Sequence, residues 1–285
     1  MVKQVWIGAA TGLALMAAER SSPEELSEAV GGGGGGGGVV AAQATTATAP
    51  ASTPRAFAMD ETERDGEGED APLRSFTYNW PAAVSAIPAL AQMLAAQRDE
   101  RLAEQKSEWE DQRLGCPPDS GACKNNAVEV SWQIVADTPR FLSLSSNIYT
   151  YAGGAHGNYG RTSLVWDREA GEALEPEALF TSPQALGGAI RPPVCRLLDR
   201  EREKRRGEPV PEGSSEWPYQ CPVMEDTVIF LGSAKGKAFD RIGVYYGPYV
   251  AGPYAEGDFE FTLPVSPAIL AAVKPRYRAA FARGS

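Results

Sequence analysis

Strict alternation of apolar and polar side chains marks several short segments in the first half of the chain. Residues 128–134 alternate without a break, 142–148 continue the theme, and 159–167 predict a third strand. A period of two residues is typical of a β-strand with one buried face. We expect the folded region to begin near Pro72, and the stretch 76–81 predicts a short extended segment at its entry.

A longer periodicity predicts the first helix, over residues 89–114. Its apolar positions recur at helical spacing, and Arg, Glu and Gln occupy the other side, which indicates one buried face. Gly115 and the two prolines after Cys116 are typical of a helix end. The predicted apolar face consists of Leu90, Met93, Leu94 and Leu102.

A second helix is predicted over residues 183–206. Its first half contains a Gly-Gly and a Pro-Pro pair, so we expect a break there. Its last turns, 200–206, are strongly charged. Glu201 and Glu203 interleave the basic residues, which predicts a solvated helix face and argues against a nucleic-acid or lipid patch.

The C-terminal part returns to strands and ends in a helix. Residues 167–172 predict a turn and 176–180 a single helical turn. The order of elements favours an α+β fold with a largely antiparallel sheet, two to three helices and two modules packed together. The remaining predicted elements are strands over 227–231, 238–246 and 258–264, and a closing helix over 267–280.

The N-terminus predicts export. Lys3 precedes a mostly apolar run over residues 5–18, which is too short to cross a bilayer and has the length of the core of a secretory signal. We assign residues 1–20 to this signal and expect a periplasmic or cell-envelope location. Glu19 stands where a lipid-accepting cysteine would be expected, so tethering to the membrane stays open.

Residues 21–70 predict a disordered linker. They contain an unbroken glycine run from Gly31 to Gly38, an Ala/Thr/Pro stretch to Pro54 and an acidic segment over 60–70. Such a composition buries too little apolar surface to offset chain entropy. A spacer of this kind would hold a domain away from a membrane or wall.

Four cysteines in an exported chain indicate two disulfides. Three pairings exist, and the short loops favour Cys116–Cys123 and Cys195–Cys221. The second pair closes a loop that stabilises the fold by about 3 kcal/mol on the loop-entropy model. With a single histidine and no paired C-x-x-C spacing, the sequence argues against a zinc site, and it indicates no other metal or cofactor.

The formal net charge is −10, from 27 basic and 37 acidic side chains. This charge argues against nucleic-acid binding and against docking on anionic lipids. It fits a cationic partner, and it equally fits simple solubility.

Little in the sequence indicates catalysis. His156 is the only histidine and lies in a glycine-rich loop over 153–158; it is either a general base or a structural residue that binds backbone. No G-x-S-x-G elbow and no phosphate-binding loop is present. We expect a non-enzymatic protein, with a cell-wall hydrolase that uses His156 or a carboxylate pair as the alternative.

The most distinctive stretch is 242–257, in which tyrosines are joined by Gly-Pro turns. Tyrosine on a constrained loop offers a large apolar face with a polar tip at low entropic cost, which suits ligand binding. The same tyrosines could instead pack the sheet, and the pattern leaves both interpretations open.

These residues resemble an uncharacterised bacterial envelope domain family. The resemblance rests on Gly153-Gly154-Ala155-His156-Gly157-Asn158, and on Tyr246-x-x-Tyr249-x-x-x-Pro253-x-Ala255-x-Gly257 about 90 residues later. The family includes the lysozyme-binding sensor domain of the RsiV-type anti-sigma factor. It also includes the non-catalytic N-terminal region of the PdaC-type peptidoglycan deacetylase.

The resemblance implies two packed modules, a PdaC-type companion module over 71–165 and an RsiV-like module over 166–285. It implies non-enzymatic binding of lysozyme or peptidoglycan outside the cytoplasm. The chain departs from both named members, since it shows no transmembrane helix and no deacetylase domain. The binding residues expected on this basis are His156, Asn158, Tyr246, Tyr249, Pro253 and Tyr254.

Overall fold

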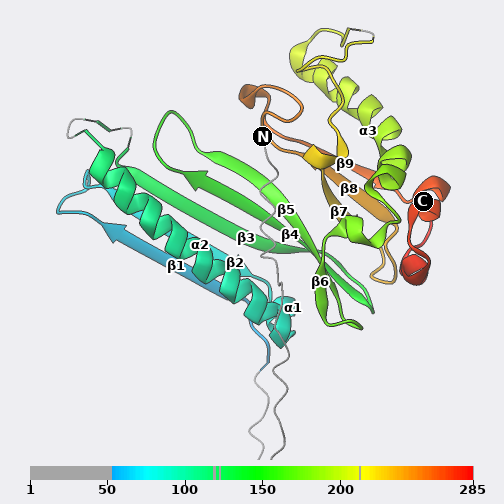
Figure 1. The fold of residues 1–285 in the computed structure, drawn as a ribbon, viewed down its shortest axis with the longest axis horizontal. Coiled ribbons are helices and arrows are strands. Elements are labelled where there is room, and N and C mark those ends of the chain that lie inside the picture. The colour runs from blue at the N-terminus through cyan, green and yellow to red at the C-terminus, as the bar shows by residue number, and fades with distance from the viewer. Residues whose placement is uncertain (1–52, 118–119, 122, 212, 285) are drawn as a thin grey trace, which may run out of the picture. The chain divides into compact units, whose positions relative to one another are not determined.

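The computed structural model describes residues 53–117, 120–121, 123–211 and 213–284 (Figure 1). The residues from Pro54 onward belong to one unit of the chain. The predicted signal over 1–20 and the first part of the predicted linker, 21–52, lie outside the described residues.

A six-stranded sheet forms the first half of this unit, with its strands in sequence order. All pairs are antiparallel except β2 and β3, because helices α1 (Ala82–Ser85) and α2 (Pro88–Gly115) connect these two strands as a crossover. The strands are β1 (Phe57–Arg64), β2 (Leu73–Trp80), β3 (Asn125–Asp137), β4 (Phe141–Tyr151), β5 (Asn158–Asp167) and β6 (Glu172–Leu174).

The predicted alternation explains how one face of this sheet is buried. In β2, every second side chain is buried and the others are only partly covered. Helix α2 lies along this face, as Figure 1 shows, with Leu90 and Leu94 fully buried and Met93 and Leu102 partly buried. The first core therefore lies between the sheet and α2.

Away from the second core, the opposite face of the sheet is polar. The register aligns Asn79, Ser131, Asn147 and Arg161 in one row across β2 to β5. Ser131 Oγ donates to Asn79 Oδ1 at 2.9 Å and Arg161 Nε donates to Asn147 Oδ1 at 2.7 Å. These hydrogen bonds fix the polar side chains in place on this part of the sheet.

The second half contains a three-stranded antiparallel sheet and helix α3 (Pro183–Arg206). Its strands are β7 (Val228–Gly232), β8 (Arg241–Tyr246) and β9 (Phe259–Pro264). The remaining helices are α4 (Pro267–Ala272) and the 3-10 helices η1 (Pro176–Leu179), η2 (Met224–Asp226), η3 (Tyr254–Glu256) and η4 (Pro275–Ala280).

A second core joins this sheet, α3 and α4 to the end of the six-stranded sheet. Phe141 and Val165 of the first sheet belong to it, together with Phe239, which lies 5.6 Å from Phe141 between ring centroids. The two halves thus share apolar packing. The prediction of an α+β fold with a largely antiparallel sheet and packed modules is confirmed.

The expected break in the second helix was wrong: α3 continues through Pro192 and Pro193. Each proline removes one helical hydrogen bond. The buried stripe of Leu186, Ile190, Val194 and Leu198, at a spacing of four residues, offsets this loss because it packs into the second core. The helix ends at Gly207, whose φ of 74° is the left-handed conformation that glycine favours.

The closing helix over 267–280 was also predicted as one element, and the structure has two. Helix α4 ends before Val273, and η4 starts at Pro275. The residue before a proline is pushed out of helical conformation by the proline ring, and Lys274 has a ψ of 139°. Pro275 therefore separates the two helices.

Two predicted boundaries need correction. The linker was expected to reach residue 70, but Phe57–Arg64 is strand β1 and pairs with all of β2. The acidic composition of this segment suggested a linker. In the structure, Glu61 and Glu63 form ion pairs with the buried Arg74, so the acidic residues belong to a strand. The module boundary between residues 165 and 166 falls inside β5, and the first sheet continues to Leu174.

The disulfide prediction is confirmed in the favoured pairing, Cys116–Cys123 and Cys195–Cys221. The predicted turn over 167–172 is present, and Asp167 stabilises it by accepting from the N–H of Glu169 at 3.0 Å. Across the described residues, we find no helix that is both long and apolar enough to span a membrane.

Candidate ligand-binding site

Five ring side chains gather where the β4–β5 loop meets the loop between β8 and β9. We call them the aromatic surface: His156, Tyr159, Trp217, Tyr249 and Tyr254. The His156 and Tyr254 rings stack at 3.8 Å between centroids with an interplanar angle of 18°, and Tyr254 lies 5.5 Å from Tyr249 and 6.0 Å from Tyr159. Large parts of three rings face solvent: Tyr159 is 39% exposed, Tyr249 44% and Trp217 51%.

Glycines give the β4–β5 loop its tight path. Gly153 and Gly154 have φ values of 86° and 92°, which favour glycine. A Cβ on Gly157 would lie only 2.4 Å from the Tyr149 ring. The backbone can therefore approach this ring only without a side chain at position 157.

The carbonyl of Gly157 ties the two loops together. Tyr254 Oη donates to it at 2.8 Å, and His156 Nδ1 lies 2.9 Å from the same oxygen. Tyr254 belongs to η3 beside the second sheet, whereas Gly157 precedes β5 of the first. The stacked pair is thus held by hydrogen bonds between the two halves of the molecule.

Tyr249 and Trp217 extend the surface from two further loops. Tyr249 has a φ of 67°, which is uncommon for a residue with a side chain and turns its ring outward in a tight bend. Trp217 Nε1 donates to the Tyr249 carbonyl at 3.3 Å. The most exposed ring is thereby linked to the backbone of its neighbour.

An ion pair between Arg206 and Glu256 connects the 247–257 loop to helix α3. Arg206 donates to both carboxylate oxygens of Glu256, at 2.8 and 2.9 Å. A Cβ on Gly252 would lie 2.4 Å from this carboxylate, so a glycine is needed there. The hydrogen bonds that Arg206 donates to Glu256 raise the pKa of Arg206 from its ordinary value.

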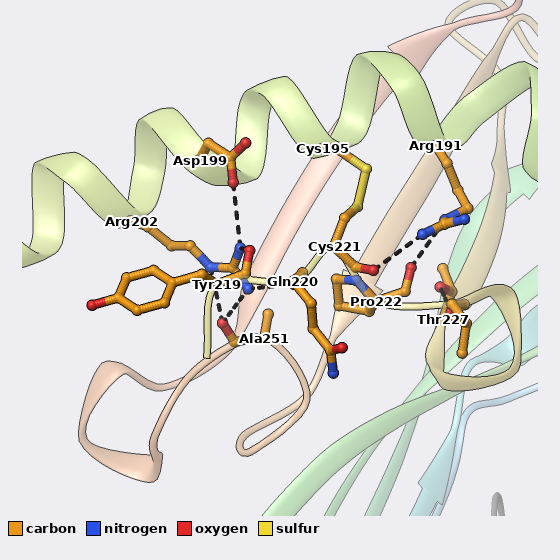
Figure 2. Close-up of a disulfide and its surroundings, with 11 residues drawn as sticks. Arg191, Cys195, Asp199, Arg202, Tyr219, Gln220, Cys221, Pro222, Thr227 and Ala251 are labelled. Atoms are coloured by element: carbon orange, nitrogen blue, oxygen red, sulfur yellow. Dashed lines mark hydrogen bonds and ion pairs between the residues drawn. A yellow bond between two sulfur atoms is a disulfide. The ribbon is translucent and has the colours of Figure 1, made fainter. Parts of the chain in front are cut away.

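The charged end of α3 was predicted as a solvated face, and for Arg202 this is wrong. Its side chain is fully buried and donates to the carbonyls of Tyr219, Gln220 and Ala251 at 2.7, 3.0 and 2.6 Å (Figure 2). Carbonyl oxygens replace the water that a guanidinium needs. Arg202 therefore ties α3 to the loop with Trp217 and to the loop with Tyr249.

The second disulfide reinforces the same connection. Cys195 in α3 is bonded to Cys221, and one turn away Arg191 donates to the carbonyls of Cys221 and Pro222, both at 3.1 Å (Figure 2). Together with Arg202, these contacts bind residues 219–222 along α3. Trp217 lies just before this bound segment in the sequence.

The residues expected to bind ligand lie in different settings. His156, Tyr249 and Tyr254 come together in the aromatic surface. Asn158 is exposed at the start of β5, paired with Thr150.

Pro253 is half-buried before η3. Tyr246 is only 1% exposed and packs in the second core, so its expected place at the surface was wrong. Burial raises the pKa of the Tyr246 hydroxyl.

Three contributors were missed by reading the sequence. Tyr159 was taken only as part of a strand, Trp217 lies in a Pro-rich loop without periodicity, and Arg202 lies in a charged run. An exposed tryptophan next to a proline, within a disulfide-closed loop, is the one signal that could have drawn attention to Trp217.

The surroundings of His156 give it a structural contact and no catalytic partner among the described residues. Its ring nitrogen contacts a backbone carbonyl, and no described side chain hydrogen-bonds to the ring. A general base is normally oriented by a neighbouring side chain or carbonyl and acts on a nucleophile within reach. In the described part of the chain, no group of three or more His, Cys, Asp or Glu side chains could hold a metal ion.

Comparison with protein families finds a match in the first half of the molecule. The family model described as "Deacetylase PdaC" matches residues 67–159. This segment is similar to that family. The resemblance drawn from the sequence is confirmed for this part of the chain. The matched segment covers β2 to β4 with α1 and α2, and it ends at Tyr159 with the loop that contains His156.

Two solved structures resemble the chain more widely. A DUF3298 family protein from Bacteroides fragilis NCTC 9343 is 17% identical, with 74% of this chain and 90% of that chain covered at a TM-score of 0.47. A DUF3298 family protein from Pseudomonas aeruginosa PAO1 is also 17% identical, with 80% and 97% covered at a TM-score of 0.46. No curated protein matches the chain.

The matched segment supplies two of the five rings of the aromatic surface, His156 and Tyr159. The other three, Trp217, Tyr249 and Tyr254, come from the second half of the molecule. The surface is thus composite, and the matched segment holds only one side of it.

Proposed function

We propose that this chain is a non-enzymatic extracytoplasmic binding module of the cell envelope, and that it holds its ligand on the aromatic surface. The observation that carries the proposal is the exposure of Tyr159 at the start of β5 and of Trp217 and Tyr249 on neighbouring loops, where hydrogen bonds to backbone fix these loops. Exposed aromatic rings on a rigid support are unusual unless they contact a partner.

Rigid aromatic side chains bind at low entropic cost. Trp and Tyr provide most of the binding energy in many interfaces, because they bury much area and lose few rotamers. Here the supporting frame consists of the Arg206–Glu256 ion pair, the Arg202 hydrogen bonds and a disulfide. A ligand would therefore meet a preformed surface.

An extracytoplasmic location is supported by the two disulfides, which persist in oxidising compartments. The match to a PdaC-type domain and the predicted signal over residues 1–20 agree with it. Lysozyme and peptidoglycan are the two candidate ligands. The net charge of −10 suits a cationic protein such as lysozyme, and the exposed rings suit the sugar rings of peptidoglycan.

The test is a titration of the full chain against lysozyme and a sedimentation assay with insoluble peptidoglycan, each at low and moderate salt. Trp217→Ala and Tyr249→Ala should weaken binding by about tenfold or more, as expected of aromatic anchors. Leu114→Ala is the matched control, because Leu114 is 87% exposed at the end of α2, away from the aromatic surface. It should bind like the unaltered chain.

Two results would contradict the proposal. One is the absence of saturable binding to either ligand. The other is binding that Trp217→Ala and Tyr249→Ala leave unchanged while both variants remain folded by circular dichroism.

A further inference from the structure

A hollow of about 260 Å³ lies on the open polar face of the six-stranded sheet, beside β8. Its floor is made by Asn79, Glu129 and Asn147, and Tyr245 and Asp258 close it from the second sheet. Tyr159 lines the hollow and also belongs to the aromatic surface. The two features are therefore continuous.

The amide groups in the hollow are oriented as donors. Asn79 Oδ1 accepts from Ser131 and Asn147 Oδ1 accepts from Arg161, so both carbonyl oxygens are engaged. An amide that accepts through its oxygen turns its NH₂ group the other way. The two NH₂ groups have no partner among the described residues and remain able to donate to a ligand.

Carboxylates supply acceptors in the same hollow. Glu129 on β3 makes no ion pair or side-chain hydrogen bond in the described part of the chain, and Asp258 makes no ion pair there. Ionised carboxylates are acceptors only. Acceptors and donors thus alternate around one small space.

The hydroxyl of Tyr245 is the least expected group in the hollow. The residue is 2% exposed, and its Oη makes no well-formed hydrogen bond among the described residues, although the Asp258 carboxylate lies beside it. Burial and the nearby charge of Asp258 raise its pKa, so the hydroxyl keeps its proton. A buried hydroxyl without a well-formed hydrogen bond is costly, and a ligand that accepts from it would remove this cost.

The hollow contains charged groups of both signs. A cation would lie against the Arg161 guanidinium and the two amide donors, and an anion would lie against Glu129 and Asp258. Arg161 is already engaged, because it pairs with Glu260 and binds Asn147. A neutral ligand that both donates and accepts is the chemical class that fits.

We propose that this hollow binds one unit of a neutral saccharide, as a subsite beside the aromatic surface. Sugar hydroxyls both donate and accept, and the Tyr149 and Tyr159 rings offer apolar faces to the ring carbons. The hollow is smaller than the roughly 300–1,000 Å³ pockets that bury drug-sized ligands, which suits a single unit of a chain. This inference rests on the proposed function and assigns its ligand class.

The experiment is a calorimetric titration of the full chain with two soluble probes, a β-1,4-linked tetramer of N-acetylglucosamine and cellotetraose. Tyr245→Phe removes only the buried hydroxyl, and Glu129→Gln removes only a charge. Each should weaken binding about five- to tenfold, the value of one lost hydrogen bond to a polar ligand. Tyr219→Phe is the matched control, since it makes the same change outside the hollow, and it should bind unchanged.

A urea titration of the same variants separates binding from folding. Tyr245→Phe should be as stable as the unaltered chain without saccharide, because its hydroxyl has no well-formed hydrogen bond to lose. Binding that Tyr245→Phe and Glu129→Gln leave unchanged would overturn the inference. So would the absence of binding to both probes at millimolar concentration.

The same titrations distinguish a failure of the saccharide subsite from a failure of the proposed function. If lysozyme or peptidoglycan binds and depends on Trp217 while neither probe binds, the subsite is wrong and the binding module stands. If the probes bind and depend on Tyr245 but not on Trp217 or Tyr249, the hollow is the site and the aromatic surface is not.

Discussion

Among the described residues, two arginines are fully buried, and they are held in different ways. Arg74 in β2 lies under α2, where only side chains bind it. Glu63 of β1 accepts at 3.0 Å, Glu61 forms a second ion pair, and Gln105 of α2 accepts at 3.2 Å. Its charge is thus balanced by carboxylates on the edge strand of the sheet.

Arg202 in α3 is held by the backbone. Its shortest contacts are with carbonyl oxygens, and the carboxylate that pairs with it, Asp199, lies 3.3 Å away and is 43% exposed. Burial lowers the pKa of Arg202 from its ordinary value, although a guanidinium stays charged in proteins. This charge is therefore stabilised by backbone dipoles.

This difference predicts which half of the molecule loses less stability when its buried arginine is replaced. A carboxylate on an edge strand can turn to water, and it can also be neutralised by acid. A buried carbonyl can do neither, and it remains without a donor unless the loop moves. The second half should therefore be the more sensitive one.

The largest effect is expected from Arg202→Leu. The buried carbonyl of Ala251 and the partly buried carbonyls of Tyr219 and Gln220 lose their donor, so the free energy of unfolding should fall by about 3–5 kcal/mol. Urea titration measures it, with Arg196→Leu on the exposed side of α3 as the matched control. Equal stability of the two variants would show that the carbonyls find water without cost.

Arg74→Leu should have a smaller effect, about 2–3 kcal/mol, because Glu63 is 56% exposed and is able to turn to solvent. The loss should be local. Hydrogen exchange should rise in β1 (Phe57–Arg64) first, since that strand supplies both carboxylates. Unchanged protection of β1 would mean that backbone pairing alone holds the strand.

The smallest effect concerns pH. Hydrogen bonds from Lys106 and Arg74 lower the pKa of Glu61, so its contribution is complete above the unfolded value of about 4.3 and is lost as pH falls through the folded value. The contribution is below about 1 kcal/mol, because the site is partly exposed. Urea titrations at pH 7 and pH 3 should show a smaller acid-induced loss in Glu61→Gln than in the unaltered chain. An equal loss in both would remove Glu61 from the acid response.

The sequence predicted an element correctly where a single local property, such as periodicity or loop length, determines it. The alternation in 128–134 and the apolar face of Leu90 and Leu94 needed only a period, and the disulfides needed only short loops. Phe57–Arg64 was missed because an acidic strand is stable only beside Arg74, and sequence does not show that contact. Tyr246 and Tyr249 are three residues apart in one motif, yet one is buried and the other exposed. Tyr246 ends β8 and packs in the second core, whereas Tyr249 lies in the turn after that strand.

The hydrogen bond from Tyr254 to the Gly157 carbonyl has a consequence for force and assembly. Any ligand that lies across the stacked His156 and Tyr254 rings contacts both halves of the molecule at once. Ligand binding and docking of the halves must then favour each other, since a ligand stabilises the state to which it binds. A mechanical force that separated the halves would release the ligand. A bound ligand would in turn raise the force needed to separate them.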